Sequence, residues 1–156
     1  MPEKRINLGI TTRLIRILTQ RGAKVIATRT SDRFIELDDR AAMAERTRAD
    51  LFVSIHADAS RNAGVRGATI YIARNASGQS RRAAQRIEAA LRSAGLECRG
   101  IRDAGFRVLV GHSRPAVLIE CGFLTNRREA KLLNTAAHQE WIADAIADGI
   151  AAHFGR

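Results

Sequence analysis

The stretch Leu-Phe-Val-Ser-Ile-His at positions 51–56 decides the fold, because it is a β-branched and aromatic run that ends on a histidine. A short run of this composition predicts a β-strand. The stretch Ala-Val-Leu-Ile at positions 116–119 has the same character and is followed by Glu120. The two stretches therefore predict two strands, each with a titratable side chain at its carboxyl end.

Helices and strands are predicted to alternate along the rest of the chain, without internal repeats or low-complexity linkers. Apolar residues recur at three- and four-residue steps in positions 6–18 and 77–94, which predicts amphipathic helices closed by Gly22 and Gly95. Further helices are expected at 38–47 and near Asn126 and His138, and further strands at 24–28, 68–72 and 106–110. The predicted fold class is α/β, a three-layer α/β/α sandwich around a mostly parallel twisted sheet.

Length and composition bound the architecture. With 156 residues the chain has the size of a single domain. Its 46% hydrophobic and 27% charged residues are ordinary for a globular domain. No run of about 18 apolar residues is present, so no transmembrane segment is expected. The first residues lack the apolar stretch of a secretory signal, so no export signal is expected within this chain.

The formal net charge of +10 indicates an anionic partner or a basic solvated surface. Nucleic acid is one such partner, but the arginines are spread along the chain and form no block. One tryptophan and one tyrosine are the main stacking platforms, and no nucleic-acid-binding motif is present. Nucleic-acid binding is therefore not the expected function.

The strand ends point to a candidate site. In α/β sheets, ligands and chemistry lie beyond the carboxyl ends of the strands, where His56 and Glu120 are both expected. A histidine and a carboxylate at one edge can act as metal ligand and general base. The residues alone leave a second interpretation open, in which His56 only ends its strand and Glu120 pairs with an arginine.

Longer motifs around these residues carry a family resemblance. Positions 51–58 (LFVSIHAD) and 115–126 (PAVLIECGFLTN) resemble the two signature motifs of the zinc-dependent N-acetylmuramoyl-L-alanine amidases. Positions 3–8, with Glu-Lys followed by Asn-Leu, look like the acidic motif that opens the first helix of that family. The family's sequence pattern is also matched, in the same order along the chain, by Thr28, Arg29, Leu37, Arg40 and Asp50. The resemblance covers nearly the whole chain.

The resemblance implies a reaction and a set of site residues. In this family zinc is held by His, Glu and His, and a water completes the site. Glu3 matches the Glu ligand, His56 the second His ligand, and Glu120 the catalytic glutamate. That glutamate activates the water and protonates the leaving amine. The implied substrate is peptidoglycan, cut between N-acetylmuramic acid and L-alanine, in the periplasm or the extracellular cell wall.

One part of the family pattern has no match in this chain. The first His ligand of the family lies in a glycine-rich loop after an N-terminal strand, ahead of the position of Glu3. We therefore expect residues 1–156 to be a single catalytic domain that is N-terminally incomplete relative to the family. His112 is the only other histidine near an expected strand end, and it is a poor substitute because a three-ligand site needs fixed geometry.

This departure has consequences for folding and for function. In the family the extra strand lies between the strands expected at 24–28 and 52–56, so we expect instability or a rearranged sheet. Three functions are therefore considered. The first is a zinc-dependent amidase, and the second is a metal-free, non-catalytic remnant of the family with a peptidoglycan-binding or regulatory role. The least favoured is a nucleic-acid binder. The sequence gives no prediction for the oligomeric state.

Overall fold

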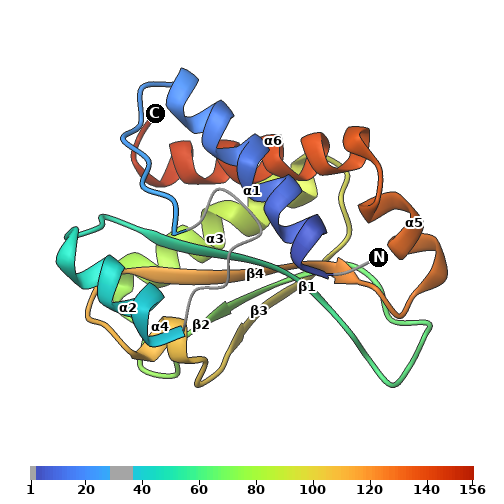
Figure 1. The fold of residues 1–156 in the computed structure, drawn as a ribbon, viewed down its shortest axis with the longest axis horizontal. Coiled ribbons are helices and arrows are strands. Elements are labelled where there is room, and N and C mark those ends of the chain that lie inside the picture. Colours follow the sequence, from blue (N-terminus) through green and yellow to red (C-terminus); the bar gives the residue numbers. More distant parts are fainter. Residues whose placement is uncertain (1–2, 29–36) are drawn as a thin grey trace.

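One open sheet of four strands, in the order β1-β4-β2-β3, forms the centre of the computed structural model, which describes residues 3–28 and 37–156 (Figure 1). The strands are β1 (Phe52–Asp58), β2 (Ala68–Ile72), β3 (Cys98–Asp103) and β4 (Ala116–Phe123). β1 pairs with β4 in parallel, β2 pairs with β3 in parallel, and β2 pairs with β4 antiparallel. The prediction of a mostly parallel sheet is confirmed.

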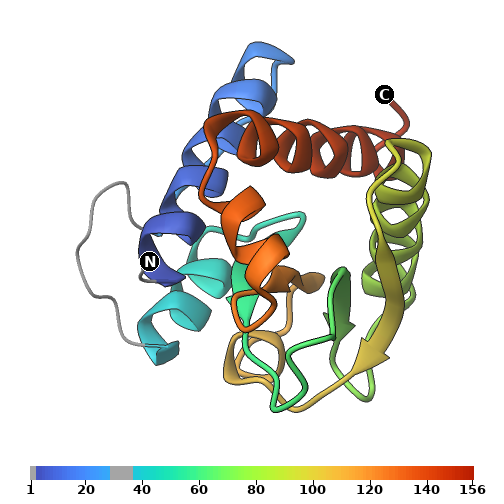
Figure 2. The ribbon, with the colours of Figure 1, turned by 90° about the vertical axis from the view of Figure 1, so that its right-hand side faces the viewer.

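Helices cover both faces of this sheet, as expected for the predicted three-layer sandwich. The helices are α1 (Glu3–Gln20), α2 (Leu37–Arg46), α3 (Gly78–Ser93), α4 (Arg107–Val110), α5 (Arg127–Leu133) and α6 (Ala136–His153). Helices α1, α3 and α6 lie on one face, and α2 and α4 lie on the other (Figure 1). Figure 2 shows α6 running between α1 and α3, and it contacts both.

The larger of two apolar clusters fills the layer between the sheet and the three long helices. The stripe that predicts α1 supplies four buried side chains: Ile6, Ile10, Leu14 and Ile17. From α6, Ile142, Ile146 and Ile150 pack into the same cluster. Strand β4 is buried along its whole length, as the central strand of such a layer must be. Burial of this apolar surface is the main force that holds α1 and α6 on the sheet.

A glycine sets the distance between α6 and α3. A Cβ atom at Gly149 would lie 2.6 Å from the Cα of Ile87 and 3.0 Å from its backbone nitrogen. Real Cβ contacts with backbone atoms are not that short, so any larger residue would push the two helices apart. Gly149 therefore permits the close packing of α6 on α3 within the layer of helices formed by α1, α3 and α6.

Two helix starts agree with the sequence. The side chain of Ser77 accepts a hydrogen bond from the Ser80 N–H at the start of α3, and Asn126 caps α5 through the Glu129 N–H. Such side-chain caps satisfy backbone donors that a helix leaves free. Within residues 3–28 and 37–156, no helix has the length and apolar character to cross a bilayer.

Two predicted strands, at 24–28 and 106–110, were wrong, and one strand of the sheet was not predicted. Residues 24–27 are not a strand, and β1 lies at an edge of the described sheet, so no neighbouring strand offers that segment hydrogen bonds. Residues 107–110 form the short helix α4, in which the adjacent Val108 and Leu109 are both buried. The strand β3 was missed because its arginines, glycine and aspartate hide the pattern. Arg29 lies outside the described residues.

Candidate functional site

The parallel register of β1 and β4 places His56 directly beside Glu120. Side chains alternate between the two faces of a strand. Ile55 and Ile119 point into the large apolar cluster under α1 and α6, so His56 and Glu120 point to the opposite face. The prediction that the two side chains reach the same edge of the sheet is confirmed.

Glu3, the first residue of α1, reaches the same place from the other end of the chain. Its Oε1 lies 3.4 Å from Nδ1 of His56, across 53 positions of sequence. The Asn7 side chain, one turn further along α1, donates a hydrogen bond to the same Oε1 at 3.4 Å. The structure therefore brings together all three residues that the sequence selected: Glu3, His56 and Glu120.

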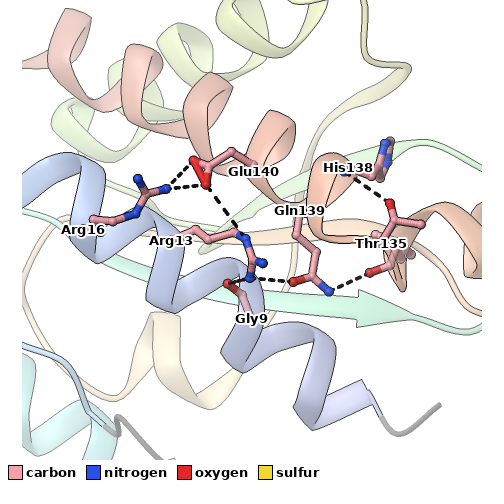
Figure 3. A network of polar contacts seen from close by, with 8 residues as sticks. Gly9, Arg13, Arg16, Thr135, His138, Gln139 and Glu140 are labelled. Carbon is pink, nitrogen blue, oxygen red and sulfur yellow. Dashed lines mark hydrogen bonds and ion pairs between the residues drawn. The ribbon is translucent and has the colours of Figure 1, made fainter.

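The position of Glu3 depends on how α1 docks on α6, where a polar network links the two helices (Figure 3). Arg13 on α1 donates to the Gln139 side chain at 3.0 Å and to the Gly9 carbonyl at 3.1 Å. Gln139 in turn donates to the Leu133 carbonyl at 2.8 Å, and Arg16 pairs with Glu140. These contacts fix the rotation of α1 and thereby aim its first turn at β1.

Both ring nitrogens of His56 have a polar neighbour. Nδ1 faces Glu3, and Nε2 lies 2.8 Å from the Ser54 hydroxyl. Burial lowers the pKa of His56, and the nearby Glu3 carboxylate opposes that shift only in part. The imidazole is therefore neutral near pH 7, which is the form that binds metal ions.

Glu120 is the buried carboxyl of the site. Its side chain is 8% exposed, and among the described residues its Oε2 atom has no hydrogen-bond partner. Burial raises the pKa of Glu120 to about 8, and the negative charges of Asp58 and Glu3 add to the effect. A carboxyl with a pKa near neutrality can both accept and donate a proton, which is the property of a general acid–base group.

This raised pKa predicts a pH-dependent stability in the metal-free chain. Because Glu120 binds its proton more tightly in the folded state, its contribution is full below pH about 4.5 and is lost as the pH rises towards 8. The loss has an upper limit of about 1.4 kcal/mol per pH unit. Urea unfolding in chelator at several pH values should show a decline that Glu120→Gln removes. Parallel pH profiles for the two proteins would contradict the prediction.

Glu3 and His56 fit a shared metal ion in distance and in chemistry. Tetrahedral zinc with bonds of 2.0–2.1 Å places its ligand atoms about 3.3–3.4 Å apart. The Glu3 oxygen and the His56 nitrogen are separated by 3.4 Å. However, no group of three or more His, Cys, Asp or Glu residues with metal-binding geometry occurs in the described part of the chain. The structure thus contains two matched donors of the three that a catalytic zinc normally has.

His112 does not supply the third donor. Its Nε2 lies 2.7 Å from the Val108 carbonyl, and its Nδ1 accepts a hydrogen bond from the Arg114 N–H at 3.1 Å. Its ring packs on Phe52, the first residue of β1, with 5.3 Å between centroids. Since His56 lies towards the far end of that strand, His112 belongs to the opposite end of the sheet.

Sequence reasoning missed a carboxylate that holds the end of β4 in place. Glu129 accepts hydrogen bonds from the Phe123 N–H at 2.6 Å and from the Gly67 N–H at 3.0 Å. It thereby ties the strand that carries Glu120 to the residue that precedes β2. The signal was available, because Asn126 followed three residues later by Glu129 is a helix-start pattern. Ser54, which contacts His56, and Asp58, whose charge helps to raise the pKa of Glu120, were also missed.

Known proteins resemble this chain over nearly its whole length. The sequence model of the N-acetylmuramoyl-L-alanine amidases matches residues 1–152. YqiI of Bacillus subtilis is 37% identical over 97% of this chain and 74% of its own length. The N-acetylmuramoyl-L-alanine amidase LytC of B. subtilis is 34% identical over 97% of this chain, but the chain spans only 31% of LytC.

Solved structures give the same result. The catalytic domain of CwlV, an N-acetylmuramoyl-L-alanine amidase from Bacillus (Paenibacillus) polymyxa var. colistinus, superposes with a TM-score of 0.91 at 36% identity. The superposition covers 98% of this chain and 85% of that domain. Since both the family motifs and the fold extend over nearly all of the sequence, this chain belongs to the N-acetylmuramoyl-L-alanine amidase family.

Proposed function

We propose that this chain forms a catalytic domain that hydrolyses the amide bond between N-acetylmuramic acid and L-alanine in peptidoglycan, with zinc as cofactor. The observation that carries the proposal is the meeting of Glu3, His56 and Glu120 at one edge of the sheet. Two of these side chains are 3.4 Å apart, and the third is the register partner of His56. The proposed place of action is the periplasm or the extracellular cell wall, where this substrate occurs.

Glu120 performs the proton transfers of the proposed reaction. When bound, zinc polarises the scissile carbonyl and lowers the pKa of a coordinated water. Glu120 accepts a proton from the attacking water and delivers it to the nitrogen of the departing L-alanine. The C–N bond breaks, a C–O bond forms, and the products are a lactyl carboxylate and a free amine. Glu3 and His56 would hold the ion and would take no part in proton transfer.

Release of stem peptides tests this proposal directly. Purified sacculi incubated with the protein and zinc should release peptides that begin with a free L-alanine. Excess chelator should stop the release, and added zinc should restore it. Release that continues unchanged in chelator would overturn the role of the metal, and cleavage at another bond would overturn the assigned reaction.

The presence of only two matched donors among the described residues favours a second candidate. This is a metal-free member of the family that binds peptidoglycan or regulates its cleavage. Such a protein would sediment with sacculi in zinc and in chelator alike and would release no peptide. The same experiment therefore separates the two candidates.

Zinc binding should depend on the two matched donors. Because one of three usual protein ligands is missing from the described residues, we expect weak binding, measured by competition with a chromogenic chelator. His56→Ala and Glu3→Ala should each weaken it at least about 10- to 100-fold, since even an indirect partner of a metal ligand has that effect. His112→Ala is the matched control and should change nothing. Tight stoichiometric binding that survives both ligand substitutions would show that other residues hold the ion.

A further inference from the structure

The serine two positions before His56 contacts the imidazole on the side away from Glu3. Ser54 and His56 lie on the same face of β1 because residues i and i+2 of a strand share a face. The Ser54 Oγ lies 2.8 Å from His56 Nε2. Ser54 is only 8% exposed, so little water competes for this contact. In the described structure the Ser54 hydroxyl makes this one side-chain hydrogen bond.

The contact restricts how the ring can lie. The two nitrogens of an imidazole are on different edges of the ring, and Nδ1 of His56 is 3.4 Å from the Glu3 carboxylate. With Nε2 at Ser54 and Nδ1 at Glu3, a flip of the ring would break both contacts at once. The ring orientation is therefore set from two sides, by a residue of its own strand and by the first turn of α1.

The protonation of the two nitrogens matters for metal binding. A neutral imidazole carries one N–H, and only the other nitrogen has a lone pair free for an ion. The hydrogen bond made by one ring nitrogen selects which nitrogen binds the metal. Without an ion, Nδ1–H donates to the Glu3 carboxylate, which can only accept, and the Ser54 hydroxyl donates to Nε2. When an ion takes the place of the Nδ1 proton, the same hydroxyl can rotate and accept from Nε2–H. It does so without adding a negative charge to a site that already holds Glu3, Asp58 and Glu120.

We propose that Ser54 is a positioning residue, which holds the His56 ring with Nδ1 at the ion position beside Glu3 and with Nε2 at the Ser54 hydroxyl, both before and after an ion binds. The inference rests on the proposed role of His56 as a zinc ligand. It deepens that role by assigning the residue that orients the ligand. The alternative is that Ser54 only satisfies a buried ring nitrogen, with no effect on the ion.

Three variants test the assignment. Ser54→Ala removes the hydroxyl, and Ser54→Thr keeps a hydroxyl on a residue suited to strands. Ser93→Ala, at the exposed end of α3, is the matched control. Long-range proton–nitrogen NMR spectra of the metal-free proteins at pH 8 report the tautomer of His56. We expect Nδ1–H, which donates to Glu3, to dominate in the parent chain, in Ser54→Thr and in the control. Ser54→Ala should show a larger Nε2–H fraction, because its ring can flip.

Zinc competition supplies the second readout. Ser54→Ala should weaken binding about 10- to 100-fold, the usual effect of removing the partner of a metal-bound histidine. Ser54→Thr should stay within a few-fold of the parent chain, which also guards against a folding defect in the alanine variant. Unchanged tautomer and unchanged affinity in Ser54→Ala would overturn the inference. If Ser54→Ala changes the tautomer of His56 but the parent chain binds no zinc, Ser54 still orients the ring. That result would contradict the proposed metal function instead.

Discussion

Replacing Glu120 with glutamine is expected to lower peptidoglycan hydrolysis by the zinc-loaded protein about 10²- to 10⁴-fold. Glutamine keeps the size of the side chain and can still form hydrogen bonds, but it cannot accept a proton from water. Glu120 is buried beside His56, and within the described residues no hydrogen bond is made by its Oε2 atom. Release of stem peptides over time, measured with and without the substitution, gives the ratio of rates.

A carboxylate outside the site serves as the control for this experiment. Glu97 is exposed and pairs with Arg66 at 2.9 Å, so Glu97→Gln should leave the rate unchanged. Zinc binding by Glu120→Gln should equal that of the parent chain, because Glu120 is not a proposed ligand. A rate within a few-fold of the parent chain would remove Glu120 from the catalytic role, whatever its pKa.

Truncation of Ile146 to alanine is expected to destabilise the fold by about 2–5 kcal/mol. Ile146 is 0% exposed and lies in the apolar cluster that α6 shares with α1, α3 and the sheet. Removing its outer carbons costs their burial and leaves a cavity, because Gly149 already brings α6 as close to α3 as the backbones allow. Equilibrium unfolding in urea measures the change.

The chain offers a control of the same chemistry. Ile26 is 52% exposed, so Ile26→Ala removes the same atoms from a side chain that is largely in water. It should change the free energy of unfolding by no more than about 0.5 kcal/mol. Equal effects of the two substitutions would show that α6 does not contribute to the core as described.

The sequence predicted those helices and strands whose buried side chains form a clear apolar pattern. The helical stripe of α1 and the continuous apolar run of β4 repeat over enough residues to define their structure, and both are confirmed. Two shorter segments misled the prediction. Residues 107–110 have the composition of a strand, but their two buried side chains are adjacent, which a one-turn helix allows. Residues 98–103 are polar because β3 is an edge strand, and edge strands need few apolar residues.

The site was largely predictable because its residues lie within or beside recognisable motifs. Glu120 and His56 end apolar runs, and Glu3 opens the acidic motif of α1, so the sequence alone indicates each of them. The roles of Ser54 and Glu129 were not predictable in the same way. Each acts through a contact whose geometry needs the folded chain: a 2.8 Å approach to one particular ring nitrogen, and hydrogen bonds to backbone groups far apart in sequence.

The strand order also sets when the site can exist during synthesis. β4 lies between β1 and β2 in the sheet but follows β1, β2 and β3 in the chain. As the polypeptide leaves the ribosome, β1 therefore has no partner among the described strands, and the β2–β3 pair is not joined to it. The segment that unites them is the one that carries Glu120 to His56. A nascent chain thus acquires its proton-transfer group in the same step that completes its sheet, and partly made molecules have no assembled site.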